Sequence, residues 1–455
     1  MDYSSFSDLV RWWEESQLRF LVLCSLFLQY FLFIASFLRK YNIPSWLRFS
    51  TWLAYIGGDA IAIYALATLF NRHKQGCASQ INKHTQEWTV SSIEVVWAPT
   101  LLMHLGGQDG MTAYNIEDNE LWMRHVLTAF SQVTVAMYVF WKSWAWWPNK
   151  EATLWKTTLL VFVPGILKCF EKPWALKNAS ITSLTAMSKT IENDGGINSL
   201  DEFVKAASVW QGPLLLENDI DRKPYALFVD IIYSYDDRLR NLIYMLRNNI
   251  DREEVYDLVQ SGLSSAFDRL YTKERVFKYK RNWRGPSRLV VNRARLGSGL
   301  RAIVAYMSLQ AIKVFGTGNY RSYNNNDVMV TYILMCGTTA LEYLIANVKP
   351  FLECCGIIFK LPWPNQVPQY NLIGYMARNR RHRVLRKLAS LLGCKGTLDR
   401  LWSMKSCMSS RDITGLVYDH VRQGWEQHIL DRDTYISFNN SRGQASRLWR
   451  DIRSF

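Results

Sequence analysis

Five ionisable side chains lie within or beside apolar stretches of the sequence, where charged groups are rare. They are Asp59, Glu94, His104, Asp109 and His125. A charged group at the depth of a bilayer costs about 3 kcal/mol or more, so such residues are candidates for function. Carboxylates and imidazoles in one helical bundle are potential metal ligands or proton carriers, although their spacing specifies no particular metal.

Three interpretations of this polar set remain open: structural pairing of the charges, which we favour, transport of an ion or proton, and intramembrane hydrolysis. The sequence contains no HExxH motif, no nucleophile elbow and no histidine pair one helical turn apart. The chain is therefore expected to be non-enzymatic and to need no cofactor. Glu342 has two readings as well: it accepts hydrogen bonds from Thr338, Thr339 or Tyr343, which we prefer, or it faces a carboxylate site.

The elements that would position these residues are apolar helices. The composition, 455 residues with 49% hydrophobic and 14% aromatic side chains, excludes collagen, simple disorder and a small disulfide scaffold. A bilayer core needs about 20 helical residues, which predicts an all-α, polytopic helical membrane protein. The apolar segments are Leu18–Leu38, Ser50–Phe70, Ile93–Leu105 (too short to span alone), Leu121–Trp141, Leu154–Phe170 (marginal), Leu300–Phe315 and Val328–Ala346.

Charge sets the expected orientation and domain plan. Residues 171–455 hold 14 of the 15 net positive charges. Arg39, Lys40 and Arg48 place the first loop inside, although the next loops conflict with that rule, and we favour five crossings before a cytosolic basic region. The predicted parts are residues 1–170 (membrane bundle), 171–299 (basic amphipathic helical insertion), 300–347 (membrane hairpin) and 348–455 (basic helical tail).

One long motif identifies a family resemblance. Trp97 to His125 read WAPTLLMHLGGQDGMTAYNIEDNELWMRH, and GILKCFEKPWAL and TYILMCGTTALEY follow at Gly165 and Thr331. With the Asp59 segment, these strings resemble the plant membrane proteins of domain-of-unknown-function family 4220, over roughly residues 45 to 350. The resemblance implies a plant membrane protein without established chemistry, with stress or defence as one expected role. Relatives usually carry a second domain, family 594, so an ending in SRGQASRLWRDIRSF implies a truncated or alternatively ended member.

The basic stretches predict contact with lipid. Residues 273–295 contain nine Lys or Arg and one acidic residue, directly before an expected span. A basic segment fixed beside the cytosolic leaflet is expected to bind anionic lipid in preference to nucleic acid. A second cluster alternates with aliphatic residues in the pattern of an interfacial helix. For residues 273–295, positive charge that only fixes the membrane topology explains the pattern equally well. For the second cluster, a solvated helix face is the alternative interpretation. The candidate lipid contacts are Lys278, Lys280, Arg281, Arg284, Arg380, Arg381 and Arg383.

Two function classes follow. The first is a non-enzymatic membrane scaffold or signalling component, in the plasma membrane or an endomembrane, whose cytosolic helices bind anionic lipid and a protein partner. The second is a channel or transporter that uses the intramembrane carboxylates and histidine. The pattern sets no oligomeric state and predicts no nucleic-acid partner. Cys354 and Cys355 are either palmitoylated or, as we prefer, ordinary thiols.

Overall fold

The computed structural model describes most of the chain. The described residues are 3–40, 43–79, 92–144, 152–183, 197, 199–209, 235, 238, 239, 242, 243, 251–273, 288–321, 323–348, 364, 365, 367–370, 372–391, 395, 399 and 404–440. The chain divides into two compact units, one of residues 1–184 and 267–361 and one of residues 185–266 and 362–455, and each is described by itself.

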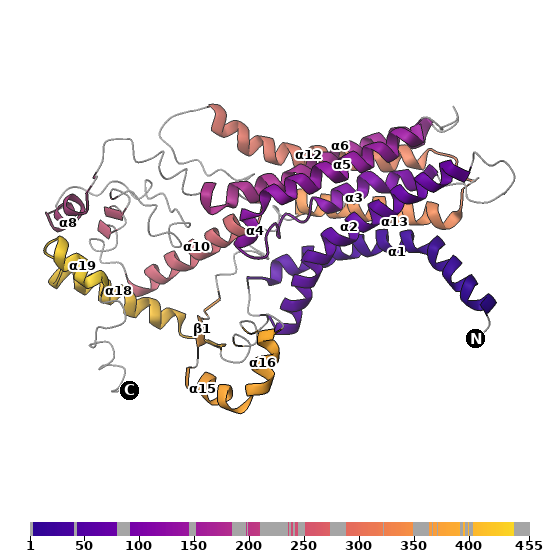
Figure 1. Cartoon of the computed structure of the whole chain (residues 1–455). Helices are drawn as coiled ribbons and strands as arrows, with labels where there is room; N and C mark the ends of the chain where they lie inside the picture. The colour runs from indigo at the N-terminus through magenta and orange to yellow at the C-terminus, as the bar shows by residue number, and fades with distance from the viewer. Residues whose placement is uncertain are drawn as a thin grey trace. The chain divides into compact units, whose positions relative to one another are not determined.

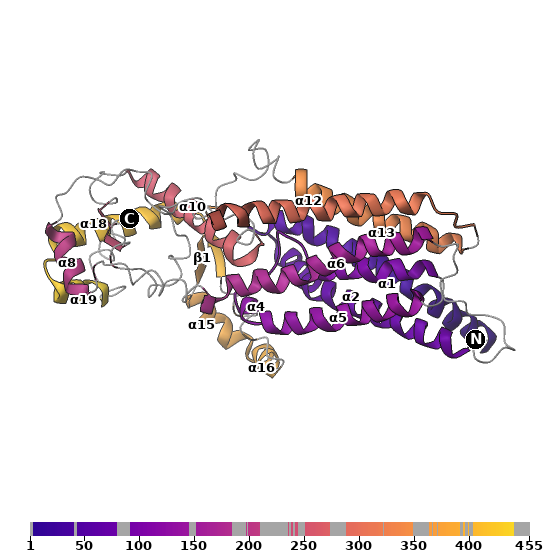
Figure 2. The same cartoon turned by 90° about the horizontal axis from the view of Figure 1, so that it is seen from above.

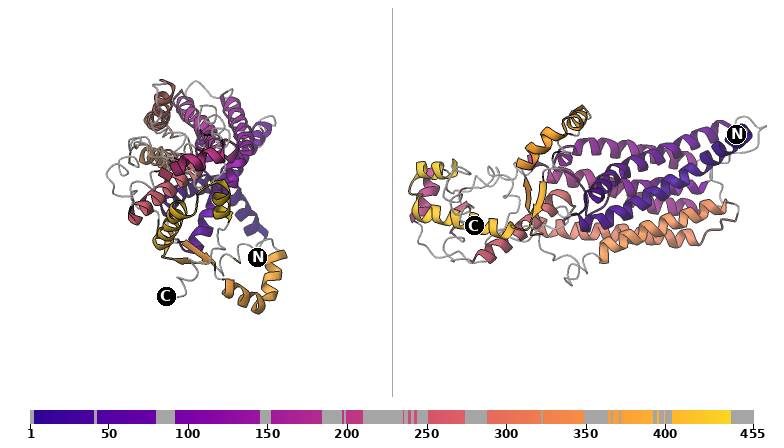
Figure 3. Two further views of the ribbon diagram at one scale, coloured as in Figure 1. Left: turned by 90° about the vertical axis from the view of Figure 1, so that its left-hand side faces the viewer. Right: turned by 90° about the horizontal axis from the view of Figure 1, so that it is seen from below.

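The first unit is a bundle of helices. Its elements are α1 (Tyr3–Leu38), α2 (Ser45–Ser79), the 3₁₀ turn η1 (Ser92–Val96), α3 (Trp97–Leu105), α4 (Glu117–Glu120), α5 (Trp122–Trp144), α6 (Ala152–Ala179), α12 (Arg288–Gly316), α13 (Asn325–Tyr343) and the π-helical turn η4 (Leu344–Val348). The long helices lie side by side (Figure 1). α6 packs against α3, α5 and α12, whereas α1 packs against α2 and α13. α12 and α13 run alongside one another (Figure 2; Figure 3, right).

Four helices in the described residues are long and apolar enough to cross a membrane. They are Ser16–Leu38, Trp46–Lys74, Thr153–Ala179 and Asn325–Ala346. At 1.5 Å per residue, the shortest rises about 33 Å, enough for the core of a bilayer. The predicted all-α class is confirmed. The expected spans Leu121–Trp141 and Leu300–Phe315 are helical within α5 and α12, but neither helix is among these four.

α3 is a helix of half length that continues as a buried loop. Its nine residues are all buried, and they rise about 14 Å. Gln29 of α1 donates to the His104 carbonyl oxygen, and Arg39, the residue that follows α1, donates to the Ala113 carbonyl oxygen. The non-helical stretch after His104 therefore runs along α1 inside the protein. Irregular backbone at such a position requires partners from its neighbours for its amide groups.

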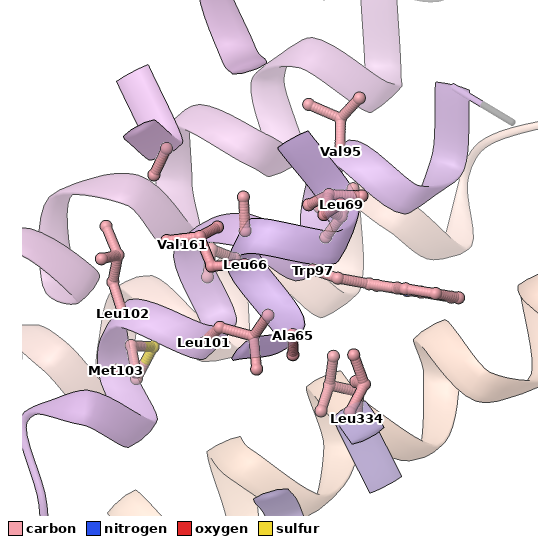
Figure 4. Packing of buried hydrophobic residues seen from close by; sticks show 14 of the residues in the cluster. Ala65, Leu66, Leu69, Val95, Trp97, Leu101, Leu102, Met103, Val161 and Leu334 are labelled. Carbon is pink, nitrogen blue, oxygen red and sulfur yellow. The ribbon is translucent and has the colours of Figure 1, made fainter. Parts of the chain in front are cut away.

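The apolar core of this unit surrounds α3. Figure 4 shows Trp97 and Leu101 of α3 near Ala65 and Leu66 of α2, with Leu334 of α13 below them. The Trp97 ring is fully buried, and its Nε1 donates to a threonine hydroxyl of α13 at 2.8 Å, so the indole has both an apolar surface and a hydrogen-bond partner.

A glycine allows α6 to approach α3 closely. An ideal Cβ at Gly165 would lie 2.6 Å from the carbonyl oxygen of Pro99. Gly106 meets α6 in the same way, since its Cβ would lie 2.6 Å from the carbonyl oxygen of Lys168. Side chains at either position would push the two elements apart, and this explains the glycines in GILK and HLGG.

The second unit is smaller and mostly helical. Its described elements are α8 (Leu200–Val209), α10 (Arg252–Tyr271, whose last turn belongs to the first unit), β1 (Val367–Tyr370), α15 (Leu372–Arg381), α16 (Arg383–Leu391), β2 (Met404–Cys407), α18 (Ser410–Gln427) and α19 (Arg432–Asn440). β1 and β2 form an antiparallel pair in which Val367 lies opposite Cys407. Phe203 of α8 packs against Trp425 of α18 and Tyr435 of α19.

Candidate functional site

The predicted polar residues lie on α2, η1, α3, the loop after α3, and α5. Asp59 of α2 accepts from the ammonium of Lys172 on α6 at 2.5 Å. Glu94 of η1 lies 3.4 Å from Arg72 Nη1 of α2. Both carboxylates therefore have a cationic partner on another element.

His104 is buried, and each of its two ring nitrogens lies near one hydroxyl group. Its Nδ1 lies 2.9 Å from Ser25 Oγ of α1, and its Nε2 lies 3.1 Å from Thr338 Oγ1 of α13. One ring nitrogen of a neutral imidazole donates and the other accepts, and a hydroxyl can serve either. The neutral ring is thus satisfied on both sides, and it joins α3 to α1 and α13.

Asp109 lies in the HLGGQD loop between two cations. Its Oδ1 is 3.5 Å from Lys273 Nζ, and its Oδ2 is 2.7 Å from Arg301 Nη2 of α12. Lys273 also lies 3.2 Å from Glu171 Oε2 of α6. His125 is a half-buried residue of α5, and within the described part of the chain no hydrogen bond or ion pair joins its side chain to the other four candidates.

Glu342 has a partner that neither sequence-based reading named. The ammonium of Lys168 on α6 donates to its Oε1, and both side chains are more than nine-tenths buried. The expected hydrogen bonds from threonine or tyrosine neighbours are replaced by this ion pair, because the buried face of α6 brings Lys168 to the Glu342 face of α13.

A common rule covers these contacts. Each carboxylate that is buried in the described residues lies within ion-pair distance of a lysine or arginine from another element. The pairs are Arg19–Asp327, Arg72–Glu94, Lys168–Glu342, Lys273–Asp109, Arg301–Asp109 and Lys273–Glu171. The set contains no group of three or more His, Cys, Asp or Glu residues arranged to hold a metal ion, as far as the described residues go.

Sequence reasoning missed the cationic half of this network. Glu171 and Lys172 follow Lys168 by three and four residues within the quoted GILKCFEKPWAL string, so the three side chains lie on one face of the helix. That spacing was a usable signal. Lys273 belongs to the basic run of residues 273–295, but its side chain is fully buried.

Arg39 joins the end of α1 to the last turn of α10. Its guanidinium lies 4.7 Å from the centre of the Tyr271 ring and 4.9 Å from that of Tyr114, and it donates to the Tyr114 carbonyl oxygen. Burial raises the pKa of the Tyr271 and Tyr114 phenols above the ordinary value. Both rings are therefore neutral near neutral pH and provide an aromatic face for the cation.

The candidate lipid contacts fall into two groups. Lys278, Lys280, Arg281 and Arg284 lie outside the described residues, as do Cys354 and Cys355. Arg380 and Arg381 end α15 and Arg383 begins α16, and all three are exposed. The neighbouring aliphatic side chains are exposed as well, and Val384 and Leu391 are 79% and 85% exposed. Among the residues that the structure describes, α16 therefore presents an exposed apolar face bordered by arginines.

The comparisons with known proteins agree with the motif reading. The family model described as a domain of unknown function, DUF4220, matches residues 52–352. No curated protein and no solved structure gave a significant match. The matched range contains the HLGGQD loop and the buried pairs of α2, α6 and α13, and it confirms the family predicted from the sequence. The chain belongs to the DUF4220 family.

Proposed function

We propose that this protein is a multi-pass integral membrane protein that acts as a non-enzymatic scaffold. The observation that carries the proposal is the distribution of polarity in the first unit, which has ion pairs inside and large apolar side chains outside. Phe27, Leu127 and Trp141 are 66%, 72% and 78% exposed on α1 and α5. Extended apolar surfaces of this kind are rare on soluble monomers, and a lipid environment would cover them.

The pairing of buried charges supports a structural role for the bundle. A carboxylate that carries a proton or ion must exchange its partner, whereas the described buried carboxylates each have a lysine or arginine beside them. Breaking a buried pair costs about 3–5 kcal/mol because it leaves a charge uncompensated. The helices are therefore held in fixed positions, as a scaffold requires.

Membrane extraction tests the first part of the proposal. The full chain, expressed in a eukaryotic host, should sediment with membranes, remain there after an alkaline carbonate wash and dissolve only in detergent. Recovery as a folded, monodisperse protein from a detergent-free supernatant would overturn the proposal.

The excess of positive charge in residues 171–455 supports a cytosolic position for residues 171–299 and 348–455.

The scaffold is proposed to contact anionic lipid through α15 and α16. The exposed arginines provide charge, at about 1 kcal/mol each near an anionic surface, and the exposed aliphatic side chains of α16 provide insertion. Arg386, in contrast, is buried against Tyr375 and Asp399, so it stabilises this helical pair instead of facing lipid.

Hydrogen–deuterium exchange in nanodiscs tests the lipid contact on the full chain. Amide exchange in α15 and α16 should be slower in nanodiscs that contain phosphatidylserine than in neutral ones. Changing Arg380, Arg381 and Arg383 together to glutamine should remove that difference, whereas the exposed control Lys205→Gln should keep it. Equal exchange in both lipids for the wild-type chain would exclude the lipid contact.

One feature favours transport as a second candidate. α3 is a buried helix of only nine residues that continues as irregular backbone, and short helices with buried irregular backbone form ion or substrate sites in many transporters. If the pairs open in a cycle, proteoliposome flux of an ion should depend on Asp59 and Asp109. Flux that is unaltered by Asp59→Asn and Asp109→Asn would remove this candidate.

A further inference from the structure

Lys273 has surroundings that differ from those of an ordinary ion pair. Its side chain is completely buried, and its ammonium lies close to four oxygen atoms of the protein. The distances are 2.9 Å to the Gly106 carbonyl oxygen, 3.4 Å to that of Gly107, 3.2 Å to Glu171 Oε2 and 3.5 Å to Asp109 Oδ1. Two main-chain carbonyls and two carboxylates thus surround one cation.

The end of α3 explains why these oxygens are available. Gly106 and Gly107 directly follow Leu105, the last residue of α3, so their carbonyl oxygens accept no hydrogen bond of the helix and lie at the negative end of its dipole. Gly107 has a φ of 65°, which closes the helix and directs the chain into the buried loop. The carbonyl oxygens of Gly106 and Gly107 are then left to bind a cation.

The oxygens outnumber the donors of the ammonium. A lysine has three N–H groups, but four oxygens approach Lys273 Nζ. Glu171, 6% exposed, also has a second oxygen, Oε1, that is buried without a hydrogen-bond partner among the described residues. This supply of acceptors is the kind that a free, multiply coordinated cation requires.

Lys273 belongs to a different segment of the chain from the residues that provide the four oxygens. The residue follows α10 by two positions, and the last turn of α10 is attached to the HLGGQD loop through its main chain. Thr112 N donates to the Tyr271 carbonyl oxygen at 2.9 Å, and Lys273 N donates to that of Asp109 at 3.0 Å. The ammonium therefore enters the site only with the docked end of α10.

We propose that the Gly106 and Gly107 carbonyls, with Glu171 and Asp109, form a binding site for a monovalent cation of the ammonium or potassium class. Lys273 occupies this site as a tethered ligand, and a free cation competes with it. Lys273 and Arg301 together balance Asp109 and Glu171, so removal of Lys273 leaves one negative charge, which a monovalent cation neutralises. The proposal is independent of the scaffold and transport roles.

Chemical rescue of Lys273→Ala tests the site. The full chain in detergent is unfolded thermally with ammonium, methylammonium or potassium chloride, against tetramethylammonium chloride at equal ionic strength. The variant should melt below wild type, and its midpoint should rise with saturation in the small cations but not in tetramethylammonium, because a ligand of the folded state stabilises it. Wild type and Lys205→Ala should respond equally to all four salts.

A second variant isolates the charge. Lys273→Ala with Glu171→Gln has no uncompensated carboxylate, so it should be more stable than Lys273→Ala and insensitive to the small cations. A Lys273→Ala protein that folds but responds to the small cations no more than to tetramethylammonium would overturn the proposal.

If Lys273→Ala does not fold, competition is measured in the wild-type protein. Lys273 should be acetylated by acetic anhydride far more slowly than the exposed Lys205, and potassium should accelerate its acetylation relative to tetramethylammonium. A rate for Lys273 that is unchanged by potassium, or equal to that of Lys205, would overturn the proposal.

Discussion

The ion pair between Lys168 and Glu342 gives the sharpest test of how the bundle is held together. It joins α6 to α13, and the two side chains are only 6% and 8% exposed. Lys168→Met leaves a buried carboxylate with no cation, which should lower the free energy of unfolding by about 3–5 kcal/mol. Glu342→Gln leaves a buried ammonium and should cost a similar amount.

The double variant separates the pair from its parts. With both residues neutral, no uncompensated charge remains, and the loss should be about 1 kcal/mol or less. The coupling energy of the double-mutant cycle is then several kcal/mol. Denaturant unfolding in detergent, followed by tryptophan fluorescence, measures all four proteins under one condition, and the 19 tryptophans give ample signal.

An exposed pair in the second unit provides the matched control. Arg432 Nη1 lies 3.5 Å from Asp201 Oδ2, and their side chains are 55% and 63% exposed. The same cycle there should give a coupling energy of at most about 1 kcal/mol. If the Lys168 and Glu342 variants each cost less than that, or if the double variant loses the sum of the two, the buried pair does not hold α6 to α13 and the reasoning fails.

Further expectations follow from single contacts. Gly165→Ala should destabilise the protein in the same unfolding assay by about 1–3 kcal/mol, because its Cβ would overlap a carbonyl of α3, whereas Gly57→Ala, with open space around it, should be neutral or stabilising by up to about 1 kcal/mol. His104→Leu should cost about 1–3 kcal/mol, since it leaves two buried hydroxyls without their ring partner. Trp97→Phe should cost about 1 kcal/mol for the lost Nε1 bond to α13. Asn439 begins the glycosylation sequon Asn439-Asn440-Ser441. Glycosidase digestion should reveal no glycan there if the tail is cytosolic, and a glycan at Asn439 would reverse the orientation.

The sequence predicts this fold better than it predicts the site. Apolar length indicated the long helices and the short segment Ile93–Leu105 that contains α3. The pairing partners depend on contacts between distant segments: Asp59 and Lys172 are 113 residues apart, and Lys168 and Glu342 are 174 apart. Periodicity along one helix reveals which face is polar, but it does not reveal which neighbour that face meets. The sequence therefore shows that α6 carries charged residues, but it does not show which residues they pair with.

The position of α6 in the bundle explains why its charges form a set. Lys168 pairs with Glu342 of α13, Glu171 with Lys273, two residues after α10, and Lys172 with Asp59 of α2. All three side chains lie on one face of the helix, so a rotation of α6 by one residue, about 100°, would break every pair at once. In the proposed bilayer, apolar packing discriminates weakly between helix rotations, because lipid covers an apolar face as well as a neighbouring helix does. Buried ion pairs penalise a wrong rotation by the cost of several unpaired charges, and we infer that they specify the register of the bundle around α6.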